Sequence, residues 1–108
     1  MRPQHYEETA LKVDLLDIAP TIPFCLGNMI KYLTRAGHKD GTDDLTKAKV
    51  YARIVNECFD ECSTWAYNNR TAWRLCVKLA KLERLYPETY NPNYQYSPAQ
   101  VVQLVLPY

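Results

Sequence analysis

The distribution of glycine constrains the fold of this chain more than any other feature of its sequence. The chain has only three glycines, Gly27, Gly37 and Gly41, and they all fall within one short segment. Glycine supplies the left-handed backbone that tight connections need, so we expect a tight polar loop within this segment, while prolines mark the other breaks in the chain. Between the seven prolines, apolar residues recur at intervals of three and four. We therefore predict an all-α protein with one tight loop between its central helices.

The apolar pattern predicts a single domain, residues 1–108, of about four main helices. Pro20 ends the first helix, and Gly37 caps the second because a left-handed residue is needed there. Two asparagines and an arginine at 68–70 separate the third helix from the fourth, which Pro87 ends. The expected helices span residues 9–19, 24–36, 43–59 with an extension of this third helix to 67, and 71–86.

The composition changes at the C-terminal tail, residues 87–108. Its first part is rich in tyrosine and proline and has no helical period, which predicts an extended segment that wraps a surface. Ser97 followed by Pro98 is typical of a helix start and predicts a short apolar helix over residues 98–105, with a strand as the alternative because of its valines. Such an apolar end is costly to expose, so we expect it to dock on its own domain or on a neighbouring subunit.

Size and charge limit the partners that this chain can have. The net charge of its 108 residues is +1 at pH 7, whereas a surface that coats nucleic acid needs a pronounced basic excess. No run reaches the roughly 20 apolar residues of a membrane-spanning helix, and the N-terminus is acidic where a signal peptide is apolar. We therefore expect a cytoplasmic protein with no extended nucleic-acid surface and no membrane contact.

The cysteines sit singly within apolar helical patterns, at Cys25, Cys58, Cys62 and Cys76. This spacing is not that of a secreted disulfide framework, so reduced thiols are expected. Cys58 and Cys62 share a helix face, which leaves a zinc site with the other two as an alternative. The spacing lacks the two-residue knuckle of common zinc sites, and buried thiols pack well as small apolar side chains. We therefore predict no metal site.

Polar residues form matched stripes on the two arms of the central hairpin, residues 24–55. Each stripe follows the spacing i, i+3, i+7, which places its members on one helix face. The stripes are Asn28, Lys31 and Arg35 on the first arm and Asp44, Lys47 and Tyr51 on the second. A purely structural interpretation is also open, in which Arg35 and Lys39 stabilise the helix dipole and Asp44 caps a solvated helix. The density of cations around one short loop favours a binding site.

The side chains of this hairpin suit a phosphate-bearing ligand. Ammonium and guanidinium groups are complementary donors for phosphate oxygens, and tyrosine rings stack on bases. The expected donors are Lys31, Arg35, Lys39 and Lys47, with Tyr32 and Tyr51 as stacking rings. A magnesium site needs clustered carboxylates, and the stripes offer only Asp44 beside Asp43 and Asp40. Neither a metal nor another cofactor is therefore expected.

The same half of the chain carries a distinctive order of residues. It reads His5-Tyr6, then Gly27-Asn28, Ile30-Lys31-Tyr32, Arg35-Ala36-Gly37 and Lys39, then Asp44-Leu45, Lys47-Ala48 and Tyr51. Over about residues 5–55 this order resembles a widespread family of small bacteriophage proteins, most of which have no assigned function. One branch of that family is a phage nucleotide kinase that phosphorylates deoxynucleoside monophosphates without a Walker loop or a metal ion, and that forms oligomers.

The resemblance implies a helical, phosphate-handling phage protein that acts in an infected host cell as a homo-oligomer. The family positions implied to take part are His5, Asn28, Lys31, Arg35, Lys39, Asp44, Lys47 and Tyr51. In a phosphoryl transfer the cations would hold the phosphates, while His5 or Asp44 would orient or deprotonate the acceptor. The alternative is a non-catalytic counter-defence protein. It would sequester a host nucleotide signal, or inhibit a host defence protein through the tyrosine-rich tail.

Overall fold

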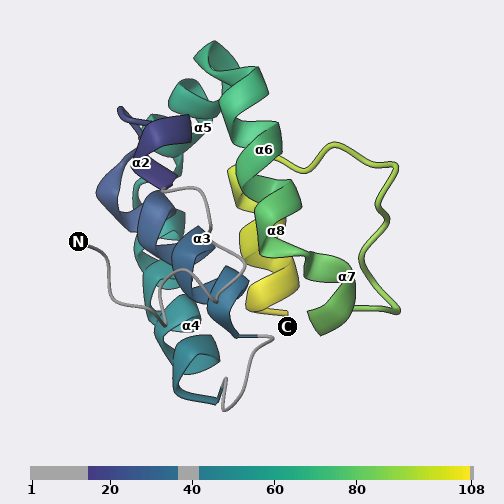
Figure 1. The fold of residues 1–108 in the computed structure, drawn as a ribbon. Helices are drawn as coiled ribbons and strands as arrows, with labels where there is room; N and C mark the ends of the chain where they lie inside the picture. The colour runs from purple at the N-terminus through teal and green to yellow at the C-terminus, as the bar shows by residue number, and fades with distance from the viewer. Residues whose placement is uncertain (1–14, 37–41, 108) are drawn as a thin grey trace, which may run out of the picture.

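The computed structural model describes residues 15–36 and 42–107, and every regular element in these ranges is a helix (Figure 1). This confirms the all-α prediction, and the strand alternative for residues 98–105 is wrong. None of the described helices has both the length and the apolar composition that crossing a membrane requires. The helices are α2 (Leu15–Ile18), α3 (Phe24–Arg35), α4 (Thr42–Glu57), α5 (Phe59–Asn68), α6 (Arg70–Ala80), α7 (Leu82–Leu85) and α8 (Pro98–Val105).

The first two predicted helices are described only in part. Of the helix expected over residues 9–19, the last turn is α2, and residues 9–14 lie outside the described residues. The second prediction agrees with α3, whose C-cap is Ala36, while the expected cap Gly37 lies outside the described residues. The third predicted helix begins one residue earlier than expected, at Thr42.

The core of the hairpin is the contact between α3 and α4, which lie side by side and antiparallel (Figure 1). The apolar stripe of α3 is fully buried, and that of α4 consists of small side chains, which lets the two helix axes approach closely. The buried residues of this contact are Leu26, Met29, Ile30 and Leu33 on α3, and Ala48, Ala52 and Val55 on α4. Their spacing of three and four is the reason that these segments are helical.

Gly27 lies inside α3, where a close approach requires a residue without a side chain. A Cβ atom at this position would lie 3.2 Å from Cγ2 of Ile22 and 3.8 Å from Cδ2 of Leu15. The segment that leads from α2 into α3 therefore packs directly on the backbone of α3. The indole Nε1 of Trp65 on α5 donates a hydrogen bond of 2.8 Å to Oγ1 of Thr21 in the same segment.

The predicted extension of the third helix to residue 67 is wrong, because the helix is interrupted at Cys58. This residue has φ −124° and ψ 43°, outside the helical region. Phe24, at the start of α3, already contacts Tyr51, so a straight continuation of α4 would run past the end of α3. The interruption instead turns α5 back onto α6 and α8, where Cys62 and Trp65 are buried.

The prediction of one unbroken fourth helix is also wrong. Asn69 separates α5 from α6, and Arg70, rather than the residue after Thr71, is the first residue of α6. The helix then ends at Ala80, because Lys81 has φ 47° and ψ 55° in the left-handed region. This turn redirects the chain so that Leu82, the first residue of α7, is fully buried.

Replacing Lys81 with glycine is expected to stabilise the protein by about 1 kcal/mol, because a side chain in the left-handed region is strained and glycine is not. The matched control is Lys78→Gly, one turn earlier within α6. There glycine is expected to destabilise the protein by about 1 kcal/mol, because it lowers helix propensity. Urea unfolding followed by circular dichroism measures both changes. Equal destabilisation by the two substitutions would contradict the described backbone at Lys81.

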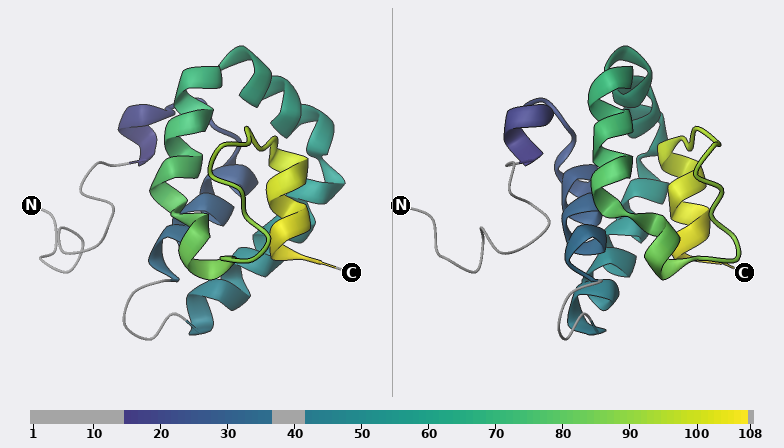
Figure 2. Two further views of the ribbon diagram at one scale, coloured as in Figure 1. Left: turned by 90° about the vertical axis from the view of Figure 1, so that its right-hand side faces the viewer. Right: turned by 45° about the vertical axis from the view of Figure 1, so that its right-hand side comes forward.

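Helix α8 completes the core and docks on its own chain (Figure 2). Ser97 and Gln100 form a reciprocal capping box at its start, with hydrogen bonds of 3.3 Å and 2.9 Å. Its buried face, formed by Val101, Val102 and Val105, packs on the core beside α4 and α5. The tail therefore belongs to the folded core and does not form a separable appendage.

The predicted wrapping segment arches from α7 to α8 without regular structure (Figure 2). The indole Nε1 of Trp73 on α6 donates a hydrogen bond of 2.7 Å to the backbone oxygen of Tyr96. The rings of Tyr90 and Tyr96 stack with centroids 5.0 Å apart, and Tyr94 meets Tyr96 edge to face at 4.9 Å. The tyrosines of the tail thus pack largely on one another.

Candidate functional site on the α3–α4 hairpin

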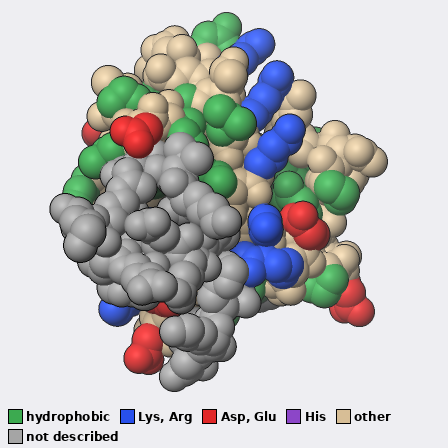
Figure 3. All heavy atoms as spheres, in the orientation of Figure 1, with side chains coloured by type: hydrophobic (Ala, Val, Ile, Leu, Met, Phe, Trp, Pro, Cys, Tyr) green, Lys and Arg blue, Asp and Glu red, His purple; other side chains and the backbone are tan. Residues whose placement is uncertain are grey.

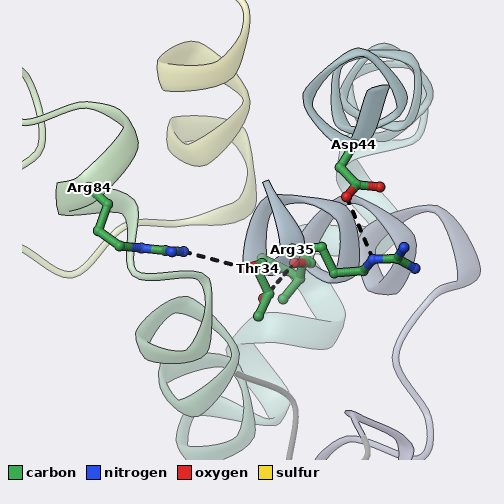
Figure 4. Close-up of polar contacts among 5 residues, drawn as sticks. Thr34, Arg35, Asp44 and Arg84 are labelled. Carbon is green, nitrogen blue, oxygen red and sulfur yellow. Dashed lines mark hydrogen bonds and ion pairs between the residues drawn. The ribbon is translucent and has the colours of Figure 1, made fainter. Parts of the chain in front are cut away.

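The end of the hairpin nearest the loop carries an ion pair between its two arms. Nε of Arg35 on α3 lies 3.6 Å from Oδ2 of Asp44 on α4 (Figure 4). Asp44 is only 9% exposed, whereas the side chain of Arg35 is 42% exposed. The two predicted stripes therefore do face each other at this level. The guanidinium of Arg35 balances the buried carboxylate and still reaches solvent.

The middle of the hairpin brings two lysines to one aromatic ring. The Nζ atom of Lys31 lies 5.6 Å from the ring centroid of Tyr32, and Nζ of Lys47, from the other helix, lies 5.4 Å from the same centroid. Both distances are within the range of cation–π attraction. The ring of Tyr32 also stacks on Tyr51, with centroids 5.8 Å apart and an interplanar angle of 13°. Four of the predicted binding residues therefore meet here.

The far end of the hairpin adds an exposed aromatic residue that sequence reasoning missed. Phe24 is 76% exposed and meets the ring of Tyr51 edge to face, with centroids 6.2 Å apart. The sequence feature that would have identified Phe24 is its spacing of eight residues from Tyr32, which places both residues on one side of α3. Asn28 lies between them in sequence, and its Nδ2 donates a hydrogen bond of 2.9 Å to the backbone oxygen of Phe24. This bond occupies one of the two amide hydrogens.

The chemical character of the hairpin surface therefore changes along its length. We call this surface the hairpin face and define it as Phe24, Asn28, Lys31, Tyr32, Arg35, Asp44, Lys47 and Tyr51. Aromatic rings occupy one end, two ammonium groups lie at the middle, and the ion pair lies at the loop end. Two further predicted residues, His5 and Lys39, lie outside the described residues. Their place beside this face stays a prediction.

A second group of cations, also missed by sequence reasoning, follows α6 and α7. Figure 3 shows Lys and Arg side chains in a row on the face that carries these helices. The spacing of three and four residues would have revealed the row. Its exposed members are Arg70, Arg74, Lys78, Lys81 and Arg84.

Two members of this row have structural roles. Arg74 donates a hydrogen bond of 2.9 Å to the side chain of Gln95 in the tail. Arg84 lies with one guanidinium nitrogen 3.4 Å from the backbone oxygen of Thr34 and 3.3 Å from that of Ala80, so it satisfies carbonyls at the ends of α3 and α6 (Figure 4). These contacts account for part of the row without a ligand. The hairpin face is therefore the stronger candidate site.

Comparison with known proteins concerns the same half of the chain. Residues 1–53 match the model of a family described as a protein of unknown function (DUF3310). The matched residues include all of α3 and most of α4, and so every residue of the hairpin face. Neither the curated proteins nor the solved structures contain a match to the chain. The likeness to this family therefore coincides with the candidate site, whereas α5 to α8 lie outside it.

Proposed function

We propose that this protein binds a nucleotide, or a related phosphate-bearing small molecule, on the hairpin face. The observation that carries the proposal is the meeting of Lys31 and Lys47, from different helices, at the ring of Tyr32. Two like charges directed to one ring repel each other, and a bound anion would relieve that repulsion. We assign the base to the ring of Tyr51, which stacks on Tyr32 and lies two turns of α4 beyond Asp44.

Each part of a nucleotide has a chemical counterpart on this face. The two ammonium groups are strong, mobile donors for phosphate oxygens. The half-exposed guanidinium of Arg35 adds a planar fork at the loop end, although Asp44 occupies one side of it. Base stacking on an aromatic side chain contributes about 1–3 kcal/mol and tolerates any base, so the rings predict affinity more than base selectivity.

We further propose phosphoryl transfer between nucleotides as the activity of this site. The support is the resemblance to the phage nucleotide kinase branch, together with a face rich in cations. Phosphoryl transfer depends mainly on holding donor and acceptor in line and on stabilising the charge of the transferred group. Lys31, Lys47 and Arg35 would do both, while Asp44 or His5 would orient or deprotonate the acceptor. The rival without turnover is sequestration of a host nucleotide signal on the same face.

A transfer assay separates these two possibilities. A deoxynucleoside monophosphate is incubated with a triphosphate donor, with and without chelator, and the nucleotides are separated by chromatography. The enzyme proposal predicts a diphosphate product that persists when the chelator is present, because the cations of the hairpin do the work of a metal ion. Absence of product under every condition would remove the enzyme proposal. Binding measured by calorimetry in the same samples would then support sequestration.

The other rival, inhibition of a host protein through the tyrosine-rich tail, is tested by changing the tail without unfolding the core. Deletion of residues 88–108 does not meet this condition, because it removes Val101, Val102 and Val105 from the core and exposes the apolar surface that they cover. Substitution of the exposed Tyr94 tests the tail without removing α8. The homo-oligomer that the family resemblance implies stays a prediction, and we propose that it would assemble through α6 and the tail.

A further inference from the structure

Three of the four cysteines gather where the break between α4 and α5 meets the start of α3. Sγ of Cys25 lies 3.6 Å from Sγ of Cys58 and 3.8 Å from Sγ of Cys62. All three sulfur atoms lie within 4.8 Å of one another. Cys25 and Cys62 are buried and Cys58 is half-buried, so the cluster has buried walls and one side near solvent. The interruption of the helix at Cys58 is part of what builds this cluster.

These separations match those of thiolates around a metal ion. A tetrahedral zinc site with Zn–S bonds of about 2.3 Å places its sulfur atoms about 3.8 Å apart. We propose that Cys25, Cys58 and Cys62 bind a zinc ion, with the fourth position open on the side of Cys58 and filled by water. Zinc binding by three protein ligands and a water molecule is a common arrangement in proteins.

Cys76 provides the contrast within the same chain. It is fully buried on α6 and is not part of the cluster. Burial raises the pKa of its thiol to about 11 and also raises the pKa of the Cys62 thiol, so the contrast with the cluster is one of geometry: Cys76 stands apart from the three converging sulfur atoms and packs as a small apolar side chain. This is the behaviour that the sequence pattern predicted for all four cysteines. The other three differ because their sulfur atoms converge from two different parts of the chain, which packing alone does not require.

The zinc site is independent of the proposed nucleotide site. Cys25 lies beside Phe24 in sequence, but it belongs to the buried side of α3, whereas Phe24 is exposed on the hairpin face. A zinc ion bound by the three cysteines would join α3 to the α4–α5 junction across 33 and 37 residues of chain. Such a link stabilises the folded state because the unfolded chain does not hold a preformed site.

The proposal is tested on the full chain, freed of metal with a chelator and kept reduced. Cobalt(II) serves as the spectroscopic probe, because thiolate ligands give it intense charge-transfer absorption. We expect this absorption at one equivalent per chain, its loss on addition of one equivalent of zinc, and a higher melting temperature with zinc. Cys58→Ser and Cys62→Ser are expected to weaken zinc binding by about 100-fold or more. Loss of a hydrogen-bond partner of a metal ligand already lowers metal affinity by about 10- to 100-fold, and these substitutions remove a ligand itself. The matched control Cys76→Ala is expected to bind zinc like the parent.

Three results would overturn the proposal. The first is a reduced, folded parent chain that gives neither cobalt–thiolate absorption nor a zinc-dependent melting shift. The second is zinc binding that Cys58→Ser leaves unchanged; this half-buried variant is checked for folding by circular dichroism. The third is a protein that zinc does not stabilise but that copper(I), or oxidation to a disulfide between Cys25 and Cys58, does. The cluster would then be a copper site or a redox-active cysteine pair.

Discussion

Replacing both Lys31 and Lys47 with alanine is expected to weaken nucleotide binding by about 100-fold or more, because each hydrogen bond from a charged donor contributes about 1.5–3 kcal/mol. The two ammonium groups come from different helices and meet at the ring of Tyr32, so the double variant removes the centre of the hairpin face. Isothermal calorimetry with a deoxynucleoside monophosphate and a triphosphate measures the loss.

The matched control for this variant is the double substitution of Lys49 and Arg53 with alanine. Both residues belong to α4 and lie on the side of the helix away from Lys47 and Tyr51, by helical spacing. The control removes the same two charges without touching the hairpin face. It is expected to change affinity by less than about threefold, because charges at a distance are screened in physiological salt. An equal loss in both double variants would show that net charge, and not the hairpin face, controls binding.

Val101→Asp in α8 is expected to have the largest effect on stability. Val101 is fully buried in the core, and an unpaired carboxylate at such a position costs several kcal/mol. Because small domains have only about 5–15 kcal/mol of stability in total, the variant is expected to lose most of its cooperative unfolding transition. Urea unfolding followed by circular dichroism measures this effect.

The control for Val101→Asp is Gln103→Asp, which places the same carboxylate on the exposed side of α8. Surface substitutions of this kind usually change stability by less than about 0.5 kcal/mol. If the two variants unfold at the same urea concentration, α8 is not part of the core and the tail is a separable segment. That result would restore the deletion experiment for the host-protein rival.

Local signals in the sequence predicted much of the fold. The spacing of Leu26, Met29, Ile30 and Leu33 identified α3 and its buried side, and Ser97 with Pro98 identified the start of α8. The two breaks that were missed have no such local signal. Lys81 adopts a left-handed backbone without being glycine, and Cys58 lies in an otherwise regular helical pattern. Both breaks are imposed by packing against distant segments, which overrides local preference.

The candidate site, like the fold, has some features that local spacing predicts and others that depend on contacts between distant segments. Spacing on each helix predicted the stripes, and the pairing of Arg35 with Asp44 confirms that they face each other at the loop end. The sharing of one ring by Lys31 and Lys47 depends on the register of α3 against α4, which a single helix pattern does not contain. Convergence of Cys25 with Cys58, 33 residues away, was beyond sequence reasoning for the same reason.

A crystal structure of the protein soaked with a deoxynucleoside monophosphate tests the central claim most directly. We expect difference density for a phosphate between the ammonium groups of Lys31 and Lys47, with the base against the rings of Tyr51 or Phe24. Clear density for the nucleotide elsewhere, such as along the cations of α6, would contradict the assignment of the hairpin face. So would a hairpin face without density in crystals soaked at nucleotide concentrations that saturate binding in solution.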